Sequence, residues 1–206
     1  MAVKNIMFDL GGVIMTIDQP SAVGRFKEIG LADAAERLDP YTQSGIFGDL
    51  EEGKISDREF IDELSKIVGR ELTYDECKYA WRGYTKEVPM RNIGILDKLK
   101  SLGYRLILIS NTNPFMMDWA LSDDFSGDGR PLSAFFDSMY MSYKMKVMKP
   151  NKKMFRQIIE KEKINPEETL FVDDGSKNIS MGKALGFKVF CPKNGEDWTT
   201  DIMKFI

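Results

Sequence analysis

The sequence predicts an α/β protein, a doubly wound parallel sheet into which an all-helical cap subdomain is inserted. Short apolar runs end at turns rich in glycine, serine, asparagine or aspartate, which is typical of buried strands. Helical patterns separate these runs, and strands that alternate with helices form parallel βαβ units. Residues 18–89 break this alternation, because helix signals are plentiful there and no strand is convincing.

The strands are expected wherever an apolar run meets such a turn. The first run holds Ile6, Met7 and Phe8 and stops at Asp9, before two glycines, so it predicts a buried strand followed by a tight loop. The expected strands cover residues 3–8, 105–109, 138–141, 169–172 and 188–191.

Three core helices are expected between these strands. Apolar residues recur at three-residue intervals before Gly103, a natural C-terminal stop, at Ile93, Leu96, Leu99 and Leu102. Pro150 is expected to open the next helix as its first residue. A short third helix is expected over residues 176–185, ahead of Gly186.

The helical stretch carries two capping boxes, in which a Ser or Thr and a Glu three residues later satisfy each other's backbone N–H groups. They are Ser56 with Glu59 and Thr73 with Glu76. We therefore expect a catalytic core of residues 1–17 and 90–206 and a helical cap of residues 18–89.

Composition narrows the function classes. The 206 residues hold 29 Lys and Arg against 32 Asp and Glu, a balance that argues against a nucleic-acid partner. No apolar run is long enough to span a bilayer, and the N-terminus lacks the pattern of a secretion signal, so a cytoplasmic protein without a membrane partner is expected. We expect a monomer or a weak homodimer.

The chain contains no histidine, which excludes Ser-His-Asp and Cys-His catalysis and most zinc sites. Cys77 and Cys191 are far apart and are expected to be reduced thiols. Any chemistry must therefore use carboxylates, lysines, hydroxyls, backbone amides and a hard cation.

The residues at the expected carboxyl ends of the strands favour phosphate chemistry. Ligands of open parallel sheets bind at that edge, where Asp9, Ser110 with Asn111, and the pair Asp173 and Asp174 would meet. Clustered carboxylates repel one another unless a cation lies between them, and oxygen ligands suit Mg²⁺. Phosphoryl transfer also needs a fixed positive charge. Lys149 is the first candidate for that charge, and Lys144 and Lys146 are the alternatives.

Four segments in order resemble the motifs of the haloacid dehalogenase-like (HAD) superfamily: residues 8–13, 109–111, 149–150 and 172–174. The helical insertion falls where that superfamily places its small cap. Residues 53–56 and 110–113 resemble the bacterial α-D-glucose-1-phosphate phosphatases of this superfamily.

The resemblance implies a role for each matching residue. Asp9 resembles the nucleophile that becomes an aspartyl-phosphate, Ser110 with the Asn111 amide would bind the phosphoryl oxygens, and Lys149 would neutralise the nucleophile and the phosphate. The metal ligands would be Asp174, the second oxygen of Asp9 and the carbonyl of Gly11. Asp173 would either be a further metal ligand or contact the ligands without touching the metal.

Gly11 departs from the usual pattern. Most phosphatases of the superfamily carry an aspartate there as general acid and base, a contribution of roughly a hundred- to ten-thousand-fold in rate. The sugar-1-phosphate relatives also carry glycine there, and an anomeric hydroxyl is a better leaving group than an ordinary alcohol. The expected function is Mg²⁺-dependent hydrolysis of a small phosphate monoester, a sugar phosphate such as a hexose 1-phosphate.

Other interpretations of the same residues stay open. Asp9 with two glycines is also an ordinary turn, and Asp173 and Asp174 are also natural helix caps. A catalytically weak phosphosugar sensor, with the same pocket, is the alternative that Gly11 supports. A phosphomutase is disfavoured because mutases use the acid that Gly11 replaces, and a dehalogenase because the Asp173–Asp174 pair favours a metal.

Overall fold

The computed structural model describes residues 2–39 and 43–206. Within them, five strands form one sheet in the order β5-β4-β1-β6-β7, and every neighbouring pair is parallel. The strands are β1 (Asn5–Phe8), β4 (Arg105–Ser110), β5 (Ser138–Met141), β6 (Thr169–Val172) and β7 (Lys188–Phe190). The predicted parallel α/β fold is confirmed, and each expected strand forms.

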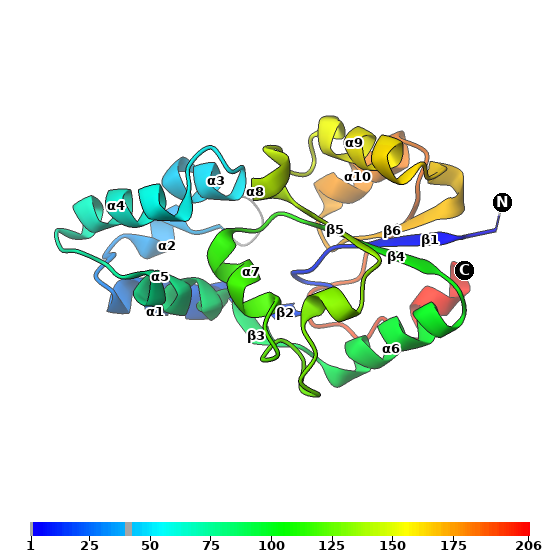
Figure 1. The fold of residues 1–206 in the computed structure, drawn as a ribbon, viewed down its shortest axis with the longest axis horizontal. Helices are drawn as coiled ribbons and strands as arrows, with labels where there is room; N and C mark the ends of the chain where they lie inside the picture. The colour runs from blue at the N-terminus through cyan, green and yellow to red at the C-terminus, as the bar shows by residue number, and fades with distance from the viewer. Residues whose placement is uncertain (1, 40–42) are drawn as a thin grey trace.

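Alternate residues of the central strands pack on opposite faces of the sheet. Ile6 and Phe8 of β1 pack with the helix α6 (Met90–Ser101), whereas Met7 packs with α9 (Lys152–Glu162). The helix α10 (Ser176–Ala184) lies beside α9, so that helices cover both faces (Figure 1). Burial on both faces explains why the strands are continuous apolar runs.

The helical stretch forms a compact group at one end of the molecule (Figure 1). Its helices are α1 (Gln19–Glu28), α2 (Ala34–Arg37), α3 (Gly45–Glu51), α4 (Asp57–Val68), α5 (Tyr74–Trp81) and the 3₁₀ turn η1 (Arg82–Tyr84). Both capping boxes form, at the first turns of α4 and α5. The rings of Phe26, Phe47, Phe60 and Trp81 contact one another with centroids 5.3–6.0 Å apart. We refer to this group as the helical insert.

A short antiparallel ribbon joins the helical insert to the sheet. It pairs β2 (Thr16–Ile17) with β3 (Thr85–Glu87). The strand β3 was not expected from the sequence, because its three residues are half-buried or exposed and carry no apolar run. Asp18, directly after β2, accepts a hydrogen bond from Ser21 N and so starts α1.

One expected helix start is wrong. Helix α9 begins at Lys152 and not at Pro150, because the side chain of Asn151 accepts a hydrogen bond from Lys153 N and caps the helix. The remaining helical elements are α7 (Pro114–Ala120), α8 (Ser142–Met145), η2 (Leu132–Ala134), η3 (Pro166–Glu168) and η4 (Asp201–Lys204).

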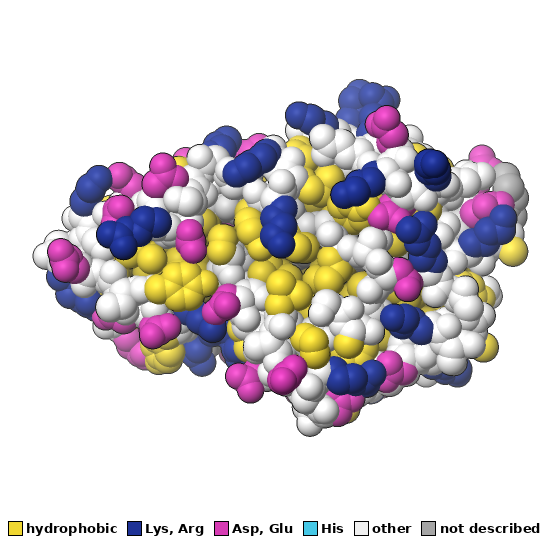
Figure 2. All heavy atoms as spheres, in the orientation of Figure 1, with side chains coloured by type: hydrophobic (Ala, Val, Ile, Leu, Met, Phe, Trp, Pro, Cys, Tyr) yellow, Lys and Arg dark blue, Asp and Glu magenta, His cyan; other side chains and the backbone are white. Residues whose placement is uncertain are grey.

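The molecular surface mixes both charges. On the face drawn in Figure 2, Lys and Arg side chains alternate with Asp and Glu around the periphery, and hydrophobic side chains gather over the middle, where α7 and α8 lie. Across residues 2–39 and 43–206, no helix has both the length and the apolar character that crossing a membrane requires.

Candidate active site

The carboxyl ends of the three central strands bring the predicted site residues together. Strand β1 lies between β4 and β6, which is the point of an open parallel sheet where ligands bind. Asp9 follows β1, Ser110 ends β4 and Asp173 follows β6. Hydrogen bonds from Asp9 N to Val172 O (2.9 Å) and from Asp173 N to Phe190 O (3.2 Å) continue the sheet and hold these positions.

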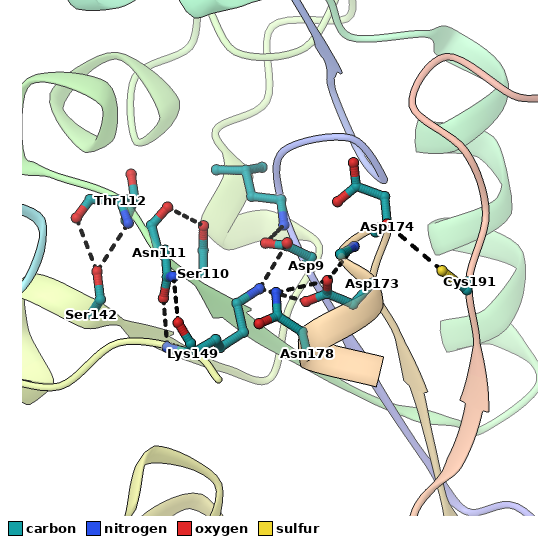
Figure 3. Close-up of polar contacts among 12 residues, drawn as sticks. Asp9, Ser110, Asn111, Thr112, Ser142, Lys149, Asp173, Asp174, Asn178 and Cys191 are labelled. Atoms are coloured by element: carbon teal, nitrogen blue, oxygen red, sulfur yellow. Dashed lines mark hydrogen bonds and ion pairs between the residues drawn. The ribbon is translucent and has the colours of Figure 1, made fainter. Parts of the chain in front are cut away.

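Lys149 connects two of the carboxylates. Its Nζ lies 2.7 Å from Asp9 Oδ2 and 2.7 Å from Asp173 Oδ2, and its side chain is 1% exposed (Figure 3). The alternatives lie elsewhere: Lys144 is exposed beside the Tyr143 ring, and Lys146 Nζ donates a hydrogen bond to Gly53 O. Of these three lysines, Lys149 is the one that the structure brings to Asp9.

Asn111 holds the backbone of Lys149. Asn111 Oδ1 accepts a hydrogen bond from Lys149 N at 2.8 Å, and Asn111 Nδ2 donates one to Lys149 O at 3.0 Å. Both polar atoms of this side chain thus position the lysine, a role that the sequence did not reveal. Ser110 Oγ makes a longer contact of 3.3 Å, to Asn111 O, and lines the pocket.

Asp173 and Asp174 are neighbours with different surroundings. Asp173 is fully buried, and its Oδ1 accepts hydrogen bonds from Gly175 N (2.8 Å) and Asn178 Nδ2 (2.9 Å). Asp173 thereby holds the turn that leads into α10, while its Oδ2 contacts Lys149. The N-cap of α10 is Gly175, with no side-chain cap hydrogen bond, so the interpretation of Asp173 and Asp174 as helix caps is wrong. Asp174 lines the pocket and lies on the side away from Lys149 (Figure 3).

Asp9, Asp173 and Asp174 can place one oxygen each within 4.8 Å of one another. The Asp9 carboxylate is oriented by Leu10 N, which donates to Oδ1 at 2.7 Å, and by Lys149 on Oδ2. Three carboxylates against one lysine leave an excess of negative charge, and hard oxygen donors suit a divalent cation. These residues therefore fit a metal ion.

The pKa values of the site residues are shifted, because these charged groups are buried and lie close to one another. Burial raises the pKa of Asp9 well above its usual range, the Asp173 and Asp174 charges add to the rise, and Lys149 opposes it. Burial and Asp173 raise the pKa of Asp174 to about 6. Burial would lower the pKa of Lys149, but Asp173 and Asp9 outweigh it and hold that pKa above its ordinary value. Lys149 therefore stays protonated at neutral pH.

The site opens into a pocket between the sheet edge and the helical insert. Gly11 and Met15 line it from the loop after β1, and Ile17 lines it from β2. Trp81 and Tyr84 line it from the helical insert and are also buried in the packing of that unit.

Glu51 is the pocket residue that the sequence interpretation missed most clearly. It ends α3, is 8% exposed, and burial raises the pKa of its carboxyl to about 8 despite the nearby Asn113 amide. A signal was present, because Glu51 lies four residues after the buried Phe47 and so shares its inward face of the helix.

The family model for haloacid dehalogenase-like hydrolases matches residues 3–186. A D-ribitol-5-phosphate phosphatase of Bacteroides thetaiotaomicron is 49% identical over 200 residues, which are 97% of each chain. The structure of a predicted HAD-like hydrolase of Porphyromonas gingivalis matches with a TM-score of 0.94, 43% identity and coverage of 99% of this chain and 98% of that one.

A HAD family enzyme of Bacteroides thetaiotaomicron, crystallised with magnesium and inorganic phosphate, matches with a TM-score of 0.89 and 32% identity. The match covers 97% of this chain and 98% of that one. The four ordered motifs, the family match and these relatives agree with one another. The chain belongs to the haloacid dehalogenase-like hydrolase family.

Proposed function

We propose that this protein is a Mg²⁺-dependent phosphatase that hydrolyses a small sugar or sugar-alcohol phosphate through an aspartyl-phosphate on Asp9. The observation that carries the proposal is the arrangement of Asp9, with one oxygen on Leu10 N and the other on Lys149, at the floor of a pocket. A relative named for phosphatase activity on D-ribitol 5-phosphate, at 49% identity, supports the substrate class.

Asp9, Asp174 and the carbonyl of Gly11 would hold Mg²⁺, with water completing the coordination. The bound ion would supply positive charge to the phosphoryl oxygens as negative charge moves onto the leaving group. We assign Asp173 to a place behind the ligands, because its oxygens already accept hydrogen bonds from Lys149, Gly175 and Asn178.

In the first step, a carboxylate oxygen of Asp9 forms a bond to phosphorus while the bond from phosphorus to the ester oxygen breaks. Lys149 balances the charge of nucleophile and phosphate, and Ser110 donates to a phosphoryl oxygen. The departing oxygen takes the electron pair and a proton from water, since Gly11 offers none. In the second step, the hydroxide left by that proton transfer forms a bond to phosphorus while the bond from phosphorus to the Asp9 oxygen breaks, which frees inorganic phosphate and restores the Asp9 carboxylate.

The test measures phosphate release from a panel that includes ribitol 5-phosphate, glucose 1-phosphate and glucose 6-phosphate, with Mg²⁺ and with EDTA. Asp9→Asn removes the attacking charge and should reduce turnover to background, whereas Asp123→Asn, an exposed aspartate, should leave it unchanged. Substantial turnover by a folded Asp9→Asn protein would exclude the aspartyl-phosphate.

The metal assignment has a readout that does not depend on turnover. Mg²⁺ should raise the Tm of the wild-type protein, because a ligand that binds the native state stabilises it. Asp174→Asn should reduce that rise at any given Mg²⁺ concentration. An equal Mg²⁺ effect on the two proteins would remove Asp174 from the ligand set.

A further inference from the structure

Four polar side chains line the wall of the pocket that the helical insert and α7 provide. They are Gln43, Glu51, Tyr84 and Asn113, and each is at most 8% exposed. We call them the distal cluster. Burial of this many polar groups beside a pocket needs an explanation, because buried polar atoms normally have hydrogen-bond partners.

Two members of the distal cluster are satisfied by the protein. Gln43 Nε2 donates to Tyr84 Oη at 3.0 Å and also to Asp39 O, while Tyr84 Oη donates to Asp39 O at 3.1 Å. Gln43 Oε1 accepts from Asp39 N at 3.3 Å. These two side chains form a fixed frame.

The other two members have unused hydrogen-bonding capacity. Asn113 Oδ1 caps α7 by accepting from Met116 N at 3.1 Å, but its fully buried Nδ2 has no hydrogen-bond partner in residues 2–39 and 43–206. Nδ2 lies close enough to Glu51 to oppose the rise in that carboxyl's pKa, without reaching hydrogen-bond geometry. Apart from this approach of Asn113 Nδ2, the described residues give the Glu51 carboxyl no hydrogen-bond partner.

The chemistry of these two groups indicates the ligand. Burial raises the pKa of Glu51 to about 8, so at neutral pH its carboxyl is uncharged and offers an O–H donor and a carbonyl acceptor. Asn113 adds an N–H donor. A neutral donor beside a neutral acceptor matches an alcohol hydroxyl, whereas a cationic ligand would need an ionised acid and a carboxylate ligand would need a basic side chain.

The distal cluster lies away from the phosphate position. Glu51 comes from α3 of the helical insert and Asn113 from the start of α7, whereas Asp9 follows β1 at the sheet edge, although all of these residues line one pocket. A group bound at Glu51 would therefore be separated from the phosphorus by several bonds of the leaving group. The apolar side chains of Met15, Ile17 and Met116 line the same pocket and would contact the carbon chain.

We propose that Glu51 and Asn113 bind a hydroxyl of the leaving group remote from the phosphate and so select polyhydroxylated chains over phosphate esters that lack hydroxyls. This inference rests on the proposed phosphatase function and names its specificity residues. It assigns to Glu51 a role in choosing the substrate, not in the bond-breaking step.

The experiment compares D-ribitol 5-phosphate with pentyl phosphate, which has the same carbon number and no hydroxyl. Glu51→Leu should lower kcat/KM for ribitol 5-phosphate about tenfold or more, the effect of losing a hydrogen bond, and leave pentyl phosphate unchanged or improved. Glu51→Gln keeps a donor and an acceptor and should hold the ratio of the two kcat/KM values within about threefold of wild type. Glu52→Gln removes a neighbouring charge outside the pocket and is the matched control.

A binding arm separates this proposal from the proposed function. In the Asp9→Asn background, calorimetry should show that Glu51→Leu weakens ribitol 5-phosphate binding and spares pentyl phosphate. If the wild-type protein hydrolyses neither ester but this binding difference holds, the phosphatase proposal fails and the hydroxyl site stands. Equal losses for both esters would make Glu51 a structural residue, and an unchanged ratio in Glu51→Leu would overturn the proposal.

Discussion

Single glycines set the spacing of the acidic groups at the site. Gly12 has a φ of +74°, and a Cβ there would lie 2.0 Å from Asp174 Oδ2. A hydrogen atom in place of a side chain therefore lets the loop after β1 approach Asp174, and the positive φ is one that glycine adopts without strain.

Gly12→Ala should displace Asp174 and lower turnover by at least about a hundredfold, since a shift of about 1 Å in a catalytic group has an effect of this size. It should also weaken the Mg²⁺-dependent rise in Tm. Gly129→Ala is the control, because Gly129 has a similar φ of +80° but open space around it, so it introduces the backbone strain alone. Equal activity of the two variants would contradict this role for Gly12.

Gly11 gives a test of the leaving-group argument. A Cβ at Gly11 would lie 2.9 Å from Ile17 Cδ1, the flexible end of a side chain, so Gly11→Asp with Ile17→Val should fit. The new acid should raise kcat/KM for glucose 6-phosphate more than for glucose 1-phosphate, because the poorer leaving group gains more from protonation. Ile17→Val alone is the control, and the absence of any relative gain would count against the argument.

At the scale of elements, the helical insert touches the sheet core near Lys149. Gly53 follows α3 with a φ of +68°, and a Cβ there would lie 2.0 Å from Tyr143 O in α8. Lys146, just after α8, donates its Nζ hydrogen bond to Gly53 O. This contact links the end of the insert that carries Glu51 to the segment that leads into Lys149.

Gly53→Ala should push α3 away from α8 and raise KM for the preferred ester about tenfold while the fold persists. Gly45→Ala is a matched control at the other end of α3, because Gly45 also has a positive φ, +57°, but nothing lies within 4 Å of its Cβ position. Michaelis kinetics and Tm, measured for both variants, test this prediction. A KM that changes equally in both would show that backbone strain, not the contact, is responsible.

Local patterns predicted most elements and failed where tertiary contacts decide. The five strands of the parallel sheet, the core helices apart from the start of α9, and both capping boxes depend on residues close in sequence, and they form as expected. Strand β3 depends on pairing with β2, about 70 residues earlier, and its own residues carry no strand signal. The helix start at Asn151 was missed because Pro150, although common in first turns, lies one residue before the cap.

The candidate site also combines residues that local sequence predicts with contacts that only the tertiary structure reveals. Asp9, Ser110, Lys149, Asp173 and Asp174 were predicted because each follows a strand or a motif, and the sheet topology then brings them together. The Asn111 contact with Lys149 and the meeting of Glu51 with Asn113 in one pocket join segments that the sequence gives no means of aligning. Spacing along the chain therefore predicts the floor of the pocket better than its walls.

At the scale of the whole molecule, Glu51 couples stability to pH. Its pKa rises from 4.5 to about 8 on folding, so the folded state binds the proton more tightly than the unfolded state does. This contribution to stability is fully present below pH 4.5 and is lost as the pH rises through about 8.

Glu51→Gln removes the ionisation and should be more stable than wild type at pH 9, by on the order of 4 kcal/mol, with little difference at pH 4.5. Denaturant unfolding at both pH values measures this, with Glu52→Gln as the control. Because the comparison is between variants at one pH, the titration of all other groups cancels. A stability difference that does not grow with pH would show that Glu51 is already ionised in the folded protein.

The ribbon of β2 and β3 has a consequence for protein engineering. Ile17 and Thr85 are paired neighbours on antiparallel strands, so the chain leaves the sheet and returns to it at almost the same place. An Asn-Gly turn could join them directly, as in a two-residue hairpin, and delete residues 18–84 without cutting the parallel sheet. The resulting minimal protein should keep the Asp9–Lys149 contact but lose one wall of the pocket. The helical insert would then be an exchangeable module, and replacing it with other helical units would change the substrate range of one unaltered reaction centre.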